Sequence, residues 1–274
     1  NNSYAALSLS TSSSMVLLCL TRYPKSLNHF NLYWYEKADQ VKDTEQQSDM
    51  LAGATAAEVD EYGYIRHEAI SDWALSSFRD HYNDATITKE DIFWYVYGIL
   101  HSTEYKQRFA ADLKKMLPRI PFAGDFRAFS DAGRKLSEWH LNYETVEPFP
   151  LDEHGGKNQS LLMIEDDDYR VSKMVFGKKG KDKDKSVIVY NSNLILEGIP
   201  LEAYEYVVNG KSAIEWVMER YQVTVDKNSH IQNDPNQWSE DPRYIVDLVK
   251  RIVRVSVETV RIVKALPPLN ETTV

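Results

Sequence analysis

Cysteine is almost absent from this sequence of 274 residues, in which Cys19 is the single one. A lone cysteine excludes a disulfide framework within the chain and a cysteine-based zinc cluster, and it favours a reducing compartment. We therefore expect a cytoplasmic protein. Because Cys19 lies within the apolar run Val16–Leu20, we interpret it as a packing residue.

Long hydrophobic runs are also missing. The longest apolar stretches, 14–20 and 92–100, are much shorter than the roughly 20 residues that a helix needs to cross a bilayer. We expect no membrane partner. The chain begins at Asn1 with neither an initiator methionine nor a secretory signal pattern, and we expect it to be a fragment whose amino-terminal part is missing.

An excess of positive charge is missing as well. The chain has 32 Lys and Arg residues against 41 Asp and Glu residues, a formal net charge of −9. Phosphate contacts require a local excess of Lys and Arg, so this balance argues against non-specific nucleic-acid binding by the chain as a whole. Any DNA-binding face must be a local patch.

Catalytic motifs are missing too. The sequence has no glycine-rich phosphate loop ending in Lys-Ser/Thr, no His-Glu-x-x-His and no Gly-x-Ser-x-Gly, and its seven histidines are scattered singly. We expect no catalytic residue, no metal site and no cofactor in this chain. The acidic run Glu165–Asp168 could hold Mg²⁺ or Ca²⁺, which leaves a metal-dependent hydrolase as a lesser alternative, but a solvated loop explains the run more simply.

The first half of the chain is predicted to pass from strands to helices. Apolar and aromatic runs predict strands at Tyr4–Leu9, Met15–Thr21 and Leu32–Tyr35, followed by a polar, acidic linker at 37–61. Helices are predicted from Ile70 to about Glu144. Their caps are predicted at Thr88, Ser102 and Ser130.

The second half is predicted to contain a hairpin followed by helices. The strands Tyr169–Phe176 and Ser186–Tyr190 would flank a loop at 177–185, and a third strand would follow at 193–196. A helix is predicted from Pro200 to Asn209-Gly210, another from the capping box Ser212–Glu215, and a long final one from Ser239–Pro242, after a turn at 233–238.

These elements predict an α+β fold that is mainly helical. It would have a small amino-terminal sheet, a helical middle, and a β-hairpin sheet followed by carboxy-terminal helices. Composition suggests domains at 1–60, 61–150 and 151–274.

Candidate DNA contacts gather on the predicted hairpin. Its tip carries five lysines against two aspartates, and two glycines would let the backbone approach a phosphate closely. A solvated loop is the plain alternative. Next to the tip are polar side chains able to bond base edges or phosphates, and further cations occur elsewhere. The full set is Lys178, Lys179, Lys181, Lys183, Lys185, Tyr190, Asn191, Asn193, Arg119, Arg134 and Lys135.

Three long strings, Ile87–Ser102, Leu117–Phe122 and Ile199–Trp216, occur in an order that resembles the carboxy-terminal region of type ISP restriction-modification enzymes. The resemblance runs from about Ile70 to Pro267. Enzymes of that family are single polypeptides that join a nuclease, a helicase-like translocase, an adenine-N6 methyltransferase and a target-recognition domain.

The resemblance implies that this bacterial chain is the target-recognition domain, with the edge of the methyltransferase at 1–60. Its partners would be duplex DNA and the upstream methyltransferase and translocase domains, which would use S-adenosylmethionine, ATP and Mg²⁺. One alternative stays open. The chain could be a helical scaffold that docks those domains without contacting bases, through its final helix and the aromatic residues Trp94, Tyr95 and Tyr97.

Overall fold

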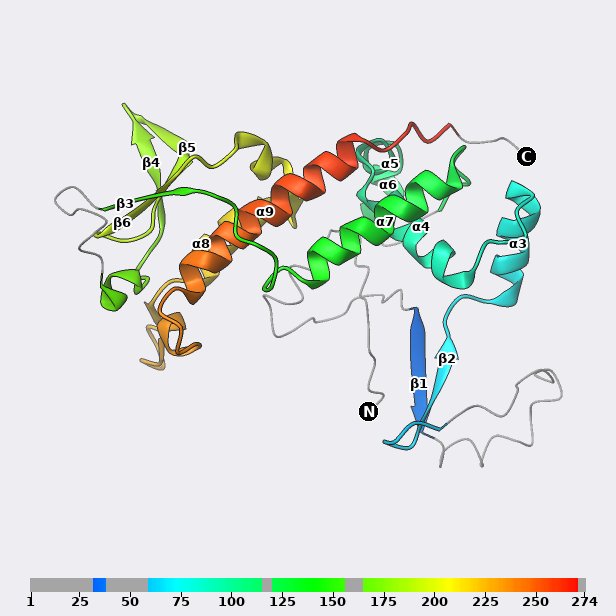
Figure 1. Cartoon of the computed structure of the whole chain (residues 1–274), viewed down its shortest axis with the longest axis horizontal. Coiled ribbons are helices and arrows are strands. Elements are labelled where there is room, and N and C mark those ends of the chain that lie inside the picture. Colours follow the sequence, from blue (N-terminus) through cyan, green and yellow to red (C-terminus); the bar gives the residue numbers. More distant parts are fainter. Residues whose placement is uncertain (1–31, 38–58, 115–119, 156–164, 271–274) are drawn as a thin grey trace. The chain divides into compact units, whose positions relative to one another are not determined.

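The computed structural model describes residues 32–37, 59–114, 120–155 and 165–270. The chain forms two compact units. Unit 1 contains the described residues up to Arg134 and those from Leu266 onward, and unit 2 contains those from Lys135 to Ala265 (Figure 1). No described helix has the length and apolar character needed to cross a membrane.

Unit 1 combines a two-stranded sheet with helices. Strand β1 (Tyr33–Lys37) pairs antiparallel with β2 (Tyr64–Glu68), which confirms the strand predicted from Leu32. The strands predicted at 4–9 and 15–21, Cys19 and most of the predicted acidic linker lie outside the described residues. The helices are α3 (Asp72–Tyr82), α4 (Lys89–His101), α5 (Thr103–Arg108), α6 (Ala110–Lys114) and α7 (Phe126–Leu141), whose last residues belong to unit 2.

Local caps define most of these helices. Thr88 forms the predicted capping box with Asp91, and the Ser102 hydroxyl accepts a hydrogen bond from the Tyr105 amide. The predicted start of the third helix at Ser130 is wrong. The helix begins four residues earlier, at Phe126, because the Asp125 carboxylate accepts a hydrogen bond from the Ala128 amide, while the Ser130 hydroxyl donates to the Asp91 carbonyl.

Helices α4 and α7 meet at two glycines. A Cβ atom on Gly98 would lie 2.2 Å from the carbonyl oxygen of Phe129, and one on Gly133 would lie 1.9 Å from that of Trp94. The two backbones are therefore in direct contact, which no other residue type permits at these positions.

Unit 2 is built on a four-stranded antiparallel sheet with the order β3-β6-β5-β4. Its strands are β3 (Asp152–Gly155), β4 (Val175–Lys179), β5 (Asp182–Val189) and β6 (Leu194–Glu197). The predicted hairpin and third strand are confirmed. The long loop predicted at 177–185 is wrong, because Gly180, with a φ of 67°, allows a two-residue turn and both strands continue almost to the tip.

Two further segments of unit 2 differ from their predictions. Strand β3 was not predicted, and the predicted strand from Tyr169 starts only at Val175, after the short 3-10 helix η2 (Asp166–Tyr169). The predicted helix from Pro200 to Asn209 is also wrong. A 3-10 turn, η3 (Leu201–Glu205), is followed by the strands β7 (Val207–Val208) and β8 (Lys211–Ser212), because Asn209 and Gly210 adopt the two positive φ angles of a tight hairpin turn.

The last part of unit 2 leads from α8 to the long final helix. Ser212 and Glu215 form the predicted capping box of α8 (Ala213–Arg220). A small hairpin, β9 (Thr224–Val225) and β10 (Gln232–Asn233), and a 3-10 turn, η4 (Pro235–Gln237), lead to the long helix α9 (Tyr244–Lys264).

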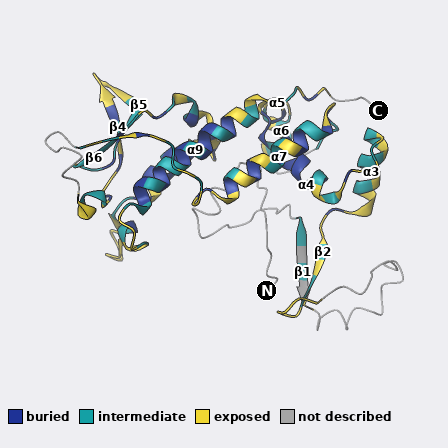
Figure 2. Cartoon of the chain, in the orientation of Figure 1, coloured by how far each residue is buried: buried dark blue, intermediate teal, exposed yellow. Residues whose placement is uncertain are grey.

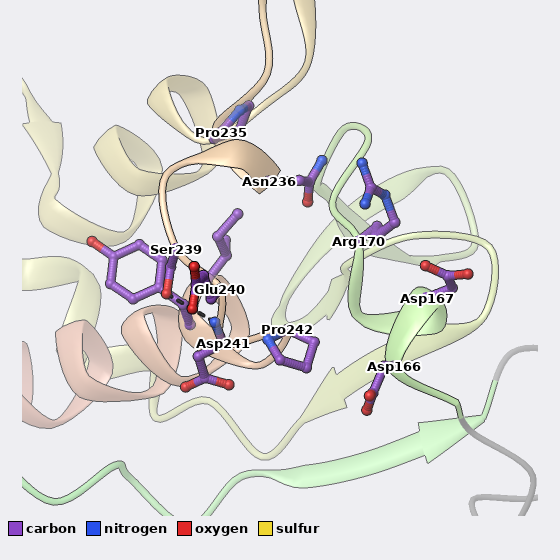
Figure 3. Close-up of a pocket in the computed structure, with 11 residues that line it drawn as sticks. Asp166, Asp167, Arg170, Pro235, Asn236, Ser239, Glu240, Asp241 and Pro242 are labelled. Carbon is purple, nitrogen blue, oxygen red and sulfur yellow. Dashed lines mark hydrogen bonds between the residues drawn. The ribbon is translucent and has the colours of Figure 1, made fainter.

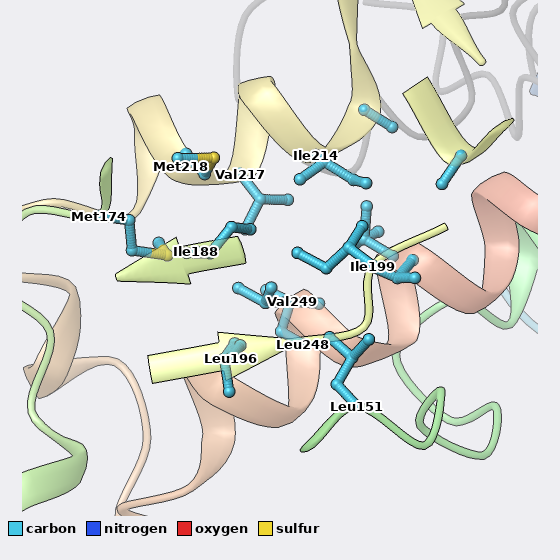
Figure 4. Close-up of a cluster of buried hydrophobic side chains, with 14 of the residues drawn as sticks. Leu151, Met174, Ile188, Leu196, Ile199, Ile214, Val217, Met218, Leu248 and Val249 are labelled. Carbon is cyan, nitrogen blue, oxygen red and sulfur yellow. The ribbon is translucent and has the colours of Figure 1, made fainter. Parts of the chain in front are cut away.

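The core of unit 2 lies where α8, α9 and the sheet meet. Helix α9 buries one whole face, and Leu248 and Val249 reach the apolar side chains of α8 and the sheet (Figures 2 and 4). The sheet contributes Ile188 and Leu196, and α8 contributes Ile214 and Val217. The α+β, mainly helical fold class is confirmed. The domain boundaries expected from composition stay a prediction.

Candidate nucleic-acid interface

Four exposed lysines surround the tip of the β4–β5 hairpin. In the strand register Lys178 stands directly opposite Lys183, and Lys179 stands opposite Asp182. Lys181 occupies the second position of the turn. Like charges that face each other across an antiparallel pair destabilise it. The opposed lysines therefore cost the free chain stability, and an anion between them would remove that cost.

The hairpin tip is set off from the sheet by a β-bulge. The register shifts between Phe176 and Gly177, where β5 contains extra residues. Gly177 is buried, and a Cβ atom there would lie 2.7 Å from the Cβ atom of Val187. Bulges bend a strand and re-aim the residues beyond them. This one fixes the direction in which the lysines project.

Lys185 differs from the other four lysines of the hairpin. Its ammonium lies 3.2 Å from a carboxylate oxygen of Glu215 and stands over the rings of Phe176 and Tyr204, at 5.5 and 4.9 Å from their centroids. Burial alone would raise the pKa of Glu215, but hydrogen bonds from Ser212 and Lys185 outweigh it and hold the pKa below its ordinary value. Lys185 thus fastens the base of the hairpin to α8.

The polar side chains that follow β5 form hydrogen bonds within unit 2. Tyr190 is fully buried, its hydroxyl donates to the carbonyl of Tyr169, and burial raises its pKa. The Asn191 amide donates to the carbonyls of Asp168 and Arg170, and its oxygen accepts from the amides of Asn193 and Leu194. The Asn193 side chain donates to the Asp168 carboxylate. In this structure these side chains join the sheet to η2.

The remaining candidate cations are not part of the hairpin sequence. Arg134 belongs to unit 1, where it pairs with Glu90 at 2.6 Å and with Asp91 at 3.1 Å. Lys135 is exposed and is the first described residue of unit 2. Arg119 lies outside the described residues. Among the described residues of the predicted set, the five lysines lie on the hairpin, and Tyr190, Asn191 and Asn193 follow its second strand.

The aromatic residues suggested as a docking surface are inside unit 1. Trp94, Tyr95 and Tyr97 are 8%, 0% and 2% exposed. Their side chains pack in the unit's own core and are not available to another domain. The scaffold alternative loses this part of its support.

A polar pocket of unit 2 has an acidic lining (Figure 3). Arg170 is its one cation, and four carboxylates stand against it, so a phosphate would meet repulsion there. Among the described residues no group of three or more His, Cys, Asp or Glu side chains is arranged to hold a metal ion. Asp168 uses its oxygens for the Glu165 amide and for Asn193. The hydrolase alternative finds no ligand set in this part of the chain. The lining residues are Asp166, Asp167, Arg170, Pro235, Asn236, Ser239, Glu240, Asp241, Pro242, Tyr244 and Ile245.

The turn predicted at 233–238 contains η4, but the β9–β10 hairpin before it was not predicted. Each of its residues from Thr224 to Asn233 is exposed. The polar stretch Asp226–His230 was the signal that could have found it, because a cluster of Asp, Asn and Ser residues after the β-branched run Val223–Val225 is typical of a turn.

Most of the chain matches a known protein family. Residues 2–248 match the family model of the type ISP C-terminal specificity domain. The chain belongs to this family. The match confirms the resemblance seen in the sequence and begins much closer to the amino terminus than Ile70. No curated protein shows significant similarity to the chain.

Solved structures agree with the type ISP assignment. The chain is 31% identical to an ATP-dependent type ISP restriction-modification enzyme, LlaBIII, bound to DNA, with a TM-score of 0.69 over 89% of this chain. It is 41% identical to a nuclease-deletion mutant of the type ISP enzyme LlaGI in complex with a DNA substrate mimic, with a TM-score of 0.59 over 68% of this chain. A DrdV–DNA complex matches at 32% identity, with a TM-score of 0.61 over 77% of this chain.

The specificity domain is a small part of these relatives. The chain covers 14% of the LlaBIII chain, 17% of the LlaGI chain and 21% of the DrdV chain.

Proposed function

We propose that this chain recognises the DNA target sequence for a type ISP restriction-modification enzyme and presents duplex DNA to its methyltransferase and translocase. The observation that carries the proposal is the cluster of exposed lysines on the β4–β5 hairpin. The DNA complexes of LlaBIII, LlaGI and DrdV support duplex DNA as the ligand. The opposed pair Lys178 and Lys183 supports phosphate contact at this tip.

The hairpin lysines supply affinity and position, not base discrimination. An ammonium group donates hydrogen bonds and accepts none, and it acts on phosphate as a compact charge. Phosphate contacts fix the register of a protein on a duplex without carrying sequence information. The whole chain has a net charge of −9 and therefore repels the phosphate backbone of DNA. The lysine patch has to overcome this repulsion, so its removal should weaken DNA binding strongly.

We assign methylation, translocation and cleavage, with S-adenosylmethionine, ATP and Mg²⁺, to parts of the enzyme other than this chain. The relatives that the chain matches are much longer than the chain itself, which leaves room for these activities elsewhere in such an enzyme. The role left to the chain is to select the site at which that chemistry occurs.

Replacing Lys178, Lys181 and Lys183 by alanine together should weaken duplex binding at least tenfold at about 0.1 M salt. Each lost phosphate contact should also lower the slope of log affinity against log salt by about 0.9, because fewer counterions are released. Fluorescence anisotropy over a salt series measures both quantities. The series should be run on this chain and on this chain joined to the methyltransferase.

The matched control for this experiment replaces the exposed residues Lys173, Lys211 and Arg220 of unit 2 by alanine. It removes the same charge from the same unit but leaves the hairpin intact. An equal loss of affinity in the two triple variants would show that only net charge matters, and an unchanged salt slope in the hairpin variant would refute phosphate contact at the tip.

A further inference from the structure

The β9–β10 hairpin holds its exposed loop in one conformation. The Asp226 carboxylate accepts hydrogen bonds from the amides of Asn228 and Ser229 and from the Ser229 hydroxyl. The backbone amide of Asp226 donates to the Ile231 carbonyl at 3.0 Å, and the His230 amide donates to the Asp226 carbonyl at 2.9 Å. His230 has a φ of 54°, in the left-handed region. The only carboxylate of the loop is thus used to fix the loop's backbone.

The polar side chains of this loop are exposed to solvent. Asn228, His230, Gln232 and Asn233 are exposed, and none of their side chains has a hydrogen-bond partner among the described residues. Ile231, between two of them, is 70% exposed. The loop therefore presents amide groups that are not used within the unit, together with one apolar side chain, to solvent.

The chemistry of these side chains matches the edge of a base pair. Asn and Gln amides bind the N6 and N7 atoms of adenine through two hydrogen bonds, and apolar side chains contact the methyl group of thymine. The major groove of B-DNA is wide enough for a two-stranded β-ribbon. The loop also carries no net charge, because Lys227 balances Asp226. It can read bases but supplies little attraction to the backbone.

We propose that the β9–β10 hairpin enters the major groove and reads A·T base pairs, with the Asn228 and Gln232 amides each on a different adenine and Ile231 on a thymine methyl group. The inference rests on the proposed function in DNA recognition. It divides the work between two hairpins of unit 2, which Figure 1 shows at separate ends of that unit, with β9–β10 beside the start of α9. The β4–β5 hairpin binds phosphates through its lysines, and the β9–β10 hairpin distinguishes bases through its amides.

A selection from a pool of randomised duplexes, followed by sequencing of the bound fraction, tests the division of roles. The wild-type chain, joined to the methyltransferase, should select a defined sequence. In Asn228→Ala and in Gln232→Ala the preference for A·T should fall about tenfold or more at one position. Affinity for unrelated duplexes and the salt slope should stay as in the wild type, because no phosphate contact is lost.

Gln237→Ala is the matched control, since Gln237 is an exposed amide on the neighbouring η4 turn. It should keep the wild-type sequence preference. Thermal melting checks that each variant is folded, and a midpoint within about 2 °C of wild type is expected because each replaced side chain is exposed.

Each outcome has a separate meaning. A wild-type protein without any sequence preference overturns the proposed function and this inference together. A wild-type preference that both hairpin variants retain overturns only the inference. Loss of A·T preference in the hairpin variants but not in Gln237→Ala supports it.

Discussion

Replacing Gly133 by alanine is expected to unfold unit 1 or to destabilise it by at least about 3 kcal/mol. The added methyl group would lie 1.9 Å from the Trp94 carbonyl oxygen and 2.9 Å from the backbone nitrogen of Gly98. Backbone atoms of two helices cannot move aside as a flexible side chain does, so α4 and α7 must separate and their buried aromatic contacts weaken. Alanine gains about 1 kcal/mol in helix propensity over glycine, but overpacking of this severity exceeds that gain.

Hydrogen exchange followed by mass spectrometry measures the effect of Gly133→Ala element by element. Protection should fall in α4 more than in α8, because Gly133 packs on α4 and α8 belongs to unit 2. Asp131→Ala is the control, since Asp131 is exposed on the same helix, and it should change stability by less than about 0.5 kcal/mol. Wild-type protection of α4 in Gly133→Ala would refute the close crossing.

Signals that depend on neighbouring residues predicted the fold well. The capping boxes at Thr88 and Ser212 involve residues three apart, so they are legible in the sequence and occur in the structure as predicted. The start of α7 was misplaced because two residues could cap it, and only the tertiary contact of Ser130 with Asp91 shows that Asp125 is the one that does. The glycine contact of α4 with α7 had no local signal at all.

At the candidate site, too, local features were predictable from the sequence and features that depend on tertiary contacts were not. The hairpin lysines were visible as a charge run, but the direct opposition of Lys178 and Lys183 depends on a register that the two-residue turn sets. Tyr190 and Asn191 were chosen for residue type, although their partners, Tyr169 and Asp168, lie about twenty residues earlier in the chain. Residue type alone does not distinguish a side chain that is free to bind a ligand from one that stabilises the fold.

Replacing Glu153 by glutamine is expected to lower the free energy of unfolding by about 3 kcal/mol at pH 7. The carboxylate, 14% exposed on β3, binds two cations of the α9 segment: Arg243 at 2.7 and 3.2 Å and Lys250 at 2.7 Å. Removing one partner of a buried ion pair costs about 3–5 kcal/mol. The lower end applies because Arg243 is 34% exposed and keeps its pairing with Asp247 at 3.2 Å.

The pH dependence of this loss follows from the sign of the pKa shift. Burial alone would raise the pKa of Glu153, but hydrogen bonds from Arg243 and Lys250 outweigh it and leave the pKa below its ordinary value. The stabilisation is therefore complete above the unfolded pKa of about 4.3 and disappears as the pH falls through the folded pKa. Urea unfolding of wild type and Glu153→Gln should differ fully at pH 7 and converge in acid. Glu197, a half-exposed carboxylate on β6, provides the control. Its replacement by glutamine should change the free energy of unfolding by less than about 0.5 kcal/mol. A change as small as this for Glu153→Gln at pH 7 would show that the ion pairs do not hold β3 to α9.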